Sequence, residues 1–118
     1  MSLVRLHIDR SGRVTGTLKR LDTGAGLQPD SLYWSLWDVE SGTTINSRLN
    51  VALTPVATYV DANGVFAHTL ARADNVLADA TKTVEVHRIR YYWIYNSAID
   101  SGDAILDFEV GPDGAPTT

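Results

Sequence analysis

The chain has no cysteine, only two lysines and no long apolar run. Without cysteine it can form neither a disulfide framework nor a thiolate metal site, so the fold must rest on packing. The formal net charge of -4 and the missing lysine and arginine clusters disfavour nucleic acid and anionic membrane surfaces as partners. No segment approaches the roughly 20 apolar residues that span a bilayer.

The first ten residues alternate apolar and polar side chains, whereas a signal peptide shows an unbroken apolar stretch after a basic start. We therefore expect cytoplasmic synthesis without an export signal. Hydrophobic residues make up 44% of the 118, which is typical of a folded globular domain and excludes the disordered classes.

Recognisable catalytic motifs are also missing. The sequence has no nucleophile elbow, no serine-lysine pattern and no glycine-rich phosphate loop. His7, His68 and His87 fall on separate expected strands without a paired ligand motif, so partly buried, hydrogen-bonded histidines are favoured over a zinc site. The sequence thus predicts no catalytic residue, no cofactor and no metal, and a protein that is not an enzyme.

Carboxylates gather near the end of the chain, at Asp100, Asp103, Asp107 and Glu109. Calcium coordination and glycoside hydrolysis both use such groups, but the EF-hand spacing is absent and no cleft can be placed from the sequence. A solvated strand face and turn is the favoured interpretation, with a hydrolase as the weakest functional alternative.

Strand signals dominate the pattern. Turn residues separate short alternating stretches, and Asn63-Gly64 is the clearest tight turn, followed by a strand over 65–70. We also expect weaker strands over 44–49 and 56–60, and a long central strand over 81–95.

About seven or eight strands favour an all-β, antiparallel immunoglobulin-like β-sandwich, with a small β-barrel as the alternative. A single domain over residues 1–110 and a flexible C-terminal tail over 111–118 complete this prediction.

Two of the expected strands carry large apolar groups on both faces. Side chains alternate across a strand, so the stretches 31–37 (SLYWSLW) and 91–95 (YYWIY) place rings on both sides. One face can fill the core while the other meets a second molecule. Tyrosine, tryptophan and arginine are enriched at protein interfaces, and aromatic rows also stack on sugars. The candidate interface residues are Tyr33, Trp37, Arg88, Arg90, Tyr92 and Ile94.

Several stretches resemble the immunoglobulin-like structural domains of tailed-phage particles, notably the N-terminal domain of baseplate upper proteins. The resemblance runs from about Leu21 to Pro112. It is carried by the loop 21–25 (LDTGA), the strand-to-turn step 37–42 (WDVESG), the hairpin 61–70 (DANGVFAHTL) and the strand exit 108–112 (FEVGP).

This resemblance implies a non-enzymatic assembly role in a virion, as a tail, baseplate or head-tail component. The expected partner is protein, either another copy of the chain or other virion proteins. A carbohydrate-binding β-sandwich is the alternative.

Overall fold

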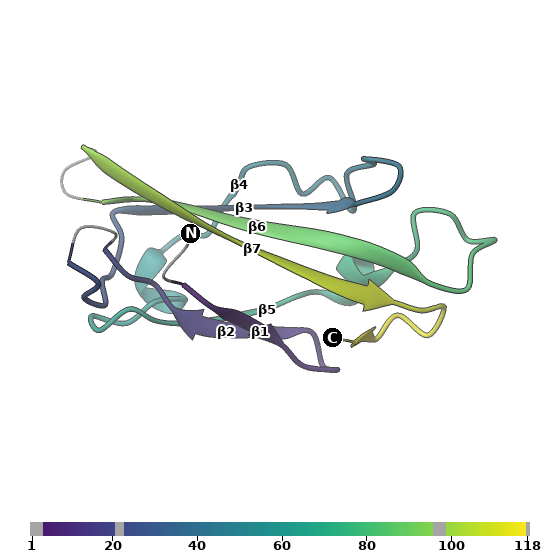
Figure 1. The fold of residues 1–118 in the computed structure, drawn as a ribbon, viewed down its shortest axis with the longest axis horizontal. Helices are drawn as coiled ribbons and strands as arrows, with labels where there is room; N and C mark the ends of the chain where they lie inside the picture. The colour runs from purple at the N-terminus through teal and green to yellow at the C-terminus, as the bar shows by residue number, and fades with distance from the viewer. Residues whose placement is uncertain (1–3, 21–22, 96–98, 118) are drawn as a thin grey trace.

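The computed structural model describes residues 4–20, 23–95 and 99–117. These residues form an all-β structure whose two antiparallel sheets lie one above the other as layers (Figure 1). The elements are β1 (Leu6–Ile8), β2 (Arg13–Thr17), β3 (Ser31–Asp38), β4 (Val51–Ala52), the 3₁₀ helix η1 (Val56–Thr58), β5 (Val65–Thr69), the 3₁₀ helix η2 (Arg72–Asn75), β6 (Glu85–Tyr95), β7 (Asp100–Val110) and β8 (Pro116–Thr117).

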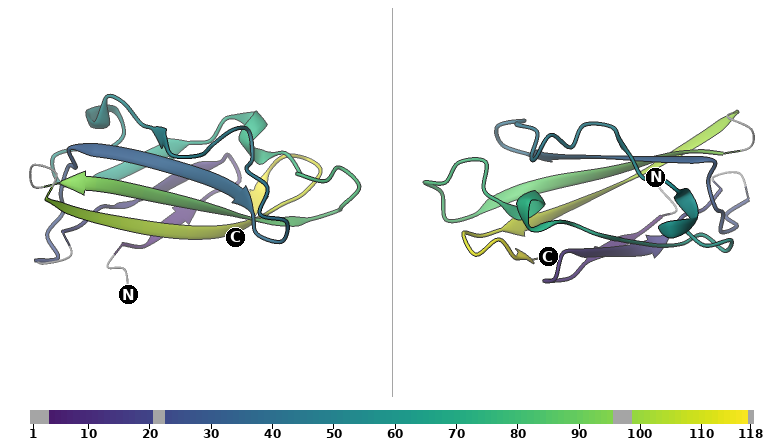
Figure 2. Two further views of the ribbon diagram at one scale, coloured as in Figure 1. Left: turned by 90° about the horizontal axis from the view of Figure 1, so that it is seen from above. Right: turned by 180° about the vertical axis from the view of Figure 1, so that it is seen from behind.

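The smaller sheet has the order β1-β2-β5 and the larger one the order β4-β3-β6-β7-β8. The long strands β3, β6 and β7 lie side by side and form one broad face (Figure 2). Among the described strands the two sheets stay separate and close no ring, so the barrel alternative is not the architecture.

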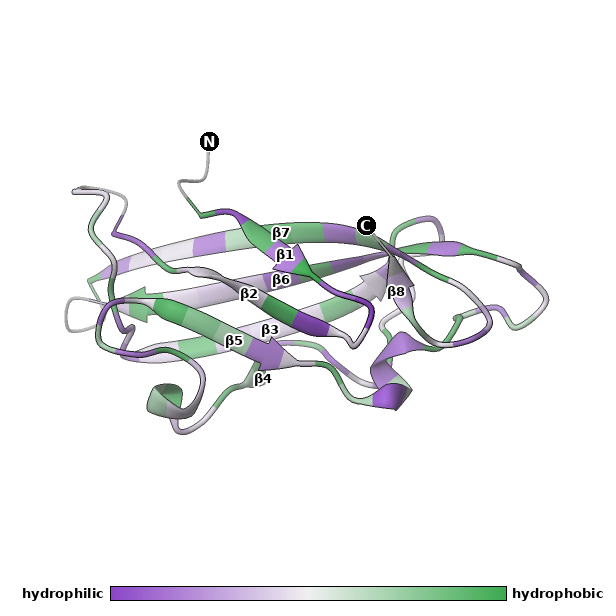
Figure 3. Cartoon of the chain, turned by 90° about the horizontal axis from the view of Figure 1, so that it is seen from below, coloured by the Kyte–Doolittle hydropathy of each residue, from purple (hydrophilic) through white to green (hydrophobic). Residues whose placement is uncertain are grey.

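The core fills the space between the layers. Apolar and polar bands follow one another along β2 and β7 (Figure 3), as strands with one buried face require. Phe66 from the smaller sheet packs edge-on against Tyr91 from the larger one, with ring centroids 4.7 Å apart. Trp34 and Trp93 are buried on the same inner side, so each aromatic strand gives part of its rings to the core.

The aromatic strand β3 and the central strand β6 are confirmed, although β6 begins at Glu85 rather than at residue 81. The Asn63-Gly64 turn is also confirmed, because Gly64 has φ +84° and its N–H donates to Asp61 O at 3.0 Å. A Cβ there would lie 2.4 Å from Leu18 O, so only glycine fits.

The strands expected over 44–49 and 56–60 are wrong. Asn46, Ser47 and Asn50 have φ between 51° and 56°, a left-handed conformation that cannot continue a strand. Residues 56–58 form η1, and the short β4 is the remaining strand between β3 and β5. In this segment the turns at Asn46, Ser47 and Asn50 prevent a strand, although the residues favour one.

The end of the chain also differs from the tail expected over 111–118. Pro116 is buried, and β8 pairs with β7 through the neighbours Val110 and Pro116. Residues 116 and 117 therefore belong to the larger sheet.

Candidate functional site: the outward face of the larger sheet

The structure places all six candidate interface residues on one side of the larger sheet, facing away from the smaller one. Side chains on β6 alternate between buried and half-buried, and the half-buried ones include the candidate residues of that strand. The candidate residues of β3 lie directly opposite them, since Tyr33 pairs with Tyr92 and Trp37 pairs with Arg88. We call this side, with its continuation on β7, the outer face. Its role as an interface stays a prediction.

The two tyrosines form a pair across β3 and β6. Their ring centroids are 6.4 Å apart, with the planes inclined by 33°. The Arg90 guanidinium lies 5.3 Å from the centre of the Tyr92 ring, within the range of a cation–π contact. Together with Asn50 and Ile94, these side chains line an open hollow of about 510 Å³.

Two arginine–aspartate pairs bridge β6 and β7 on the same face. Arg88 Nε and Nη2 donate to the two oxygens of Asp107 at 2.7 and 2.9 Å, and Arg90 Nε donates to Asp103 at 3.1 Å. The bidentate bond from Arg88 lowers the pKa of Asp107 and raises that of Arg88. Both aspartates are thus ion-pair partners on a partly solvated strand face, as the sequence predicted for this group of carboxylates.

Exposed apolar side chains extend the outer face beyond the aromatic residues. Val86 on β6 and Ile105 on β7 are 41% and 54% exposed. Val39 directly follows β3, is 40% exposed, and donates its N–H to Val86 O at 3.0 Å. These three side chains add exposed apolar surface to the outer face.

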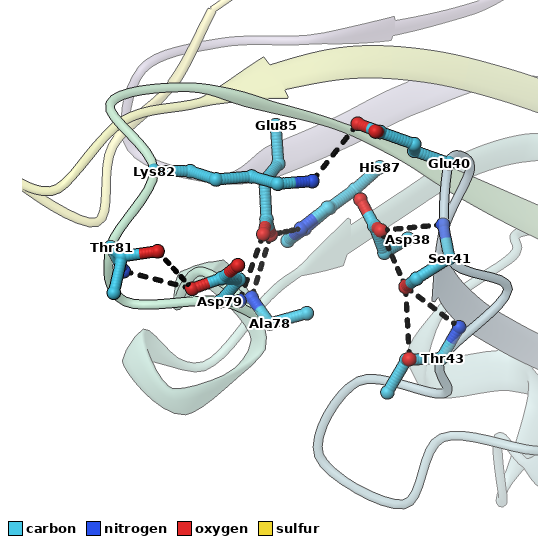
Figure 4. Close-up of polar contacts among 10 residues, drawn as sticks. All are labelled: Asp38, Glu40, Ser41, Thr43, Ala78, Asp79, Thr81, Lys82, Glu85 and His87. Carbon is cyan, nitrogen blue, oxygen red and sulfur yellow. Dashed lines mark hydrogen bonds and ion pairs between the residues drawn. The ribbon is translucent and has the colours of Figure 1, made fainter.

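A second feature, which sequence reasoning missed, is a buried polar cluster at one end of the larger sheet. It consists of Asp38 from β3 with Glu85 and His87 from β6, whose side chains point toward one another (Figure 4). All three are at most 4% exposed, and one ligand atom from each lies within 4.8 Å of the others. Asp38 and His87 are direct neighbours across the two strands.

Hydrogen bonds keep both carboxylates of the cluster ionised. Burial raises the pKa of Glu85, but the bond from His87 Nε2 at 2.9 Å and those from Ala78 and Asp79 N–H outweigh it, so this pKa falls below its ordinary value. Burial likewise opposes ionisation of Asp38, and the Ser41 hydroxyl and N–H reverse the effect.

Two atoms of the cluster have no hydrogen-bond partner, Asp38 Oδ1 and His87 Nδ1. A sequence signal for the cluster existed. Glu85 and His87 are two residues apart on a strand and so share a side with Ile89 and Tyr91. If this side of β6 is taken to face the core, the sequence predicts that the Glu85 carboxylate and the His87 imidazole are buried.

Comparison with known proteins found no matching family model, no matching curated protein and no matching solved structure. Among the described residues, the helices are too short to cross a membrane.

Proposed function

We propose that this chain is a non-enzymatic assembly module that binds another protein through the outer face. The observation that carries the proposal is the alignment of Tyr33, Trp37, Tyr92 and Ile105 with two arginines on one side of the larger sheet. Aromatic residues and arginine are enriched in protein interfaces and lysine is depleted. Neither Lys19 nor Lys82 belongs to the strands of this face.

The domain is proposed to be immunoglobulin-like. The order β1-β2-β5 corresponds to strands A, B and E of that fold, and β4-β3-β6-β7 corresponds to C′, C, F and G. Trp34 is buried on β3, where immunoglobulin domains carry a buried tryptophan on strand C.

Together with the resemblance to tailed-phage structural domains, this immunoglobulin-like fold supports a place in a virion. Capsid, portal or tail genes beside the gene for this chain would agree with that place, and a neighbourhood of unrelated metabolic genes would argue against it.

The proposed first partner is a second copy of the chain. The arginines lie on β6 and the aspartates on the adjacent β7. A two-fold axis running along the strands between β6 and β7 would lay the arginine side of one copy over the aspartate side of the other. With principal extents of 45 × 27 × 22 Å, the long face is large enough for the roughly 800 Å² per partner of a standard interface.

Mass measurement in solution tests this proposal with a matched pair of variants. Ile105 on the outer face and Val65 on β5 are β-branched strand residues that are 54% and 55% exposed. Light scattering after size-exclusion chromatography should give a dimer for the wild type and for Val65→Arg, and a monomer for Ile105→Arg. A wild-type protein that is monomeric at its highest soluble concentration, or equal behaviour of the two variants, contradicts self-association through this face.

The hollow beside Tyr33 and Tyr92 favours one alternative, a carbohydrate site. Tyrosine rings can stack on a sugar, and Asn50 and Arg90 provide hydrogen-bonding groups at its edge. A glycan array probed with the wild type and with Tyr92→Ala distinguishes the two functions. Binding that the substitution abolishes, from a protein that stays monomeric, would favour the sugar-binding module.

A further inference from the structure

We infer that Asp38, Glu85 and His87 form a binding site for a divalent transition-metal ion, with Zn²⁺ as the representative ion. This inference concerns the buried cluster alone and does not depend on the outer face. An imidazole together with two carboxylates is a donor set that Zn²⁺ and similar ions use in proteins.

The spacing of the three side chains suits one small ion. Zn²⁺ binds nitrogen and oxygen at about 2.0–2.2 Å in a tetrahedral arrangement, so the atoms that ligate it lie roughly 3.3–3.6 Å from one another. In the structure the candidate atoms lie within 4.8 Å. Side-chain rotations that bring the widest pair about an ångström closer would complete the coordination, and Asp38 and His87 are already neighbours in the β3–β6 ladder.

The cluster places two buried carboxylates next to each other, and a bound cation would stabilise them. Asp38 and Glu85 are 1% and 4% exposed, and two carboxylates in a protein interior are costly unless they are compensated. The neighbouring lysine compensates this charge only in part, because Lys82 Nζ binds Glu40 at 2.9 Å while its charge also acts on Asp38 and Glu85 (Figure 4). The three carboxylates of Asp38, Glu85 and Glu40 therefore face a single lysine, an excess of negative charge over the fixed cations. A divalent ion would neutralise it.

The unpartnered atoms are the second, independent observation. Asp38 Oδ2 accepts both hydrogen bonds from Ser41, while Asp38 Oδ1 has no partner although the residue is almost fully buried. The Asp38 carboxylate points toward Glu85 and His87 (Figure 4). Buried polar atoms are nearly always satisfied, so an oxygen left free beside an imidazole and a second carboxylate marks a position for a bound ion.

A metal here would tie three parts of the chain together. Asp38 ends β3 and Glu85 begins β6, while the backbone N–H groups of Ala78 and Asp79 hold Glu85 from the connecting segment. The ion would therefore fasten this end of the larger sheet to the segment 76–84, which is the role of a structural metal.

Thermal unfolding of metal-free protein with added ZnCl₂ tests the site. We expect Zn²⁺ to raise the midpoint temperature of the wild type by several degrees and MgCl₂ to leave it unchanged. Asp38→Asn should lose the Zn²⁺ shift. His7→Gln, which removes an exposed histidine, and Asp74→Asn, which changes a buried carboxylate outside the cluster, should keep it. The absence of a shift in the wild type, or an equal shift in Asp38→Asn, overturns the proposal.

A measurement on the wild type alone covers the case in which Asp38→Asn fails to fold. Long-range ¹H–¹⁵N NMR spectra resolve the ring nitrogens of each histidine. Titration with Zn²⁺ should shift a ring nitrogen of His87 by coordination while the signals of His68 stay in place. Saturation without any change at His87, or a change confined to His7, would show that the cluster holds only water or no ligand.

Discussion

Gly102 lies directly opposite Trp93 in the β6–β7 ladder, and a Cβ at position 102 would come within 2.8 Å of three atoms of the indole. Trp93 is fully buried, so its ring has no room to retreat. Because Gly102 has no side chain, the Trp93 indole can pack inward against β7.

Gly102→Ala should therefore destabilise the protein by about 1–3 kcal/mol, the usual cost of overfilling a packed core. Urea unfolding measures this loss. Gly111→Ala is the matched control, because a Cβ there meets its nearest neighbour at 3.5 Å, and this variant should stay close to the wild type. Equal stability of the two variants would mean that the indole moves easily, against this account of the packing.

The strands could be predicted from the sequence wherever the pattern was long and consistent. Residues 85–95 alternate between the two sides of β6 without interruption, and 104–110 continue the alternation on β7. The segment between β3 and β5 could not be predicted in the same way. Its apolar residues are typical of strands, but the left-handed conformations at Asn46, Ser47 and Asn50 turn the chain, and long-range contacts rather than propensity hold it there.

The candidate site could likewise be predicted from the sequence only in part. Within each strand the interface candidates share one side because strand periodicity requires it, and that was visible in the sequence. That the candidates of β3 and β6 lie on the same side follows from the register between the strands. Which side faces outward was not, because both sides carry rings and a shift of one residue exchanges them. The cluster of Asp38, Glu85 and His87 was hidden for a different reason, since it needs the register between β3 and β6.

His68 should make the protein less stable in mild acid. Burial lowers its pKa from 6.5 to about 4, with the Asp74 carboxylate opposing this shift and Arg48 adding to it. The imidazole lies 2.8 Å from the Tyr91 hydroxyl and stays neutral in the folded protein. In the unfolded chain it takes up a proton below about pH 6.5. The unfolded state then binds more protons, so the free energy of unfolding falls as the pH drops from about 6.5 to about 4 and levels off below.

The full contribution of His68 across that window is about 3 kcal/mol. Urea unfolding of the wild type and of His68→Gln at pH 7.5, 6 and 4.5 measures the contribution of His68, because the other titrating groups are common to both proteins. The wild type should lose more stability than the variant toward pH 4.5. Parallel losses in the two proteins would assign the acid sensitivity to other groups.

Two arginine–aspartate pairs in this protein should differ widely in their effect on stability. Asp74 is 1% exposed and accepts hydrogen bonds of 2.8 Å from Arg48 Nε, Asn46 Nδ2 and Ala71 N–H, so it fastens the turn after β3 to η2. Asp107, bound by Arg88, has a side chain that is 42% exposed. Asp74→Asn should reduce the free energy of unfolding by about 2–3 kcal/mol, because it weakens three buried bonds and leaves Arg48 without its counterion.

Asp107→Asn should cost less than about 1 kcal/mol, since water and salt screen an exposed pair. The same chemical change is thus made at two carboxylates that differ mainly in burial, and denaturant unfolding at low and high salt compares them directly. The loss at Asp74 should hardly change with salt, whereas the small loss at Asp107 should shrink further. If the two variants lost equal stability, the buried network around Asp74 would not be what holds the residues 45–50 against η2, and the apolar contacts of Ile45 with the core would have to do so instead.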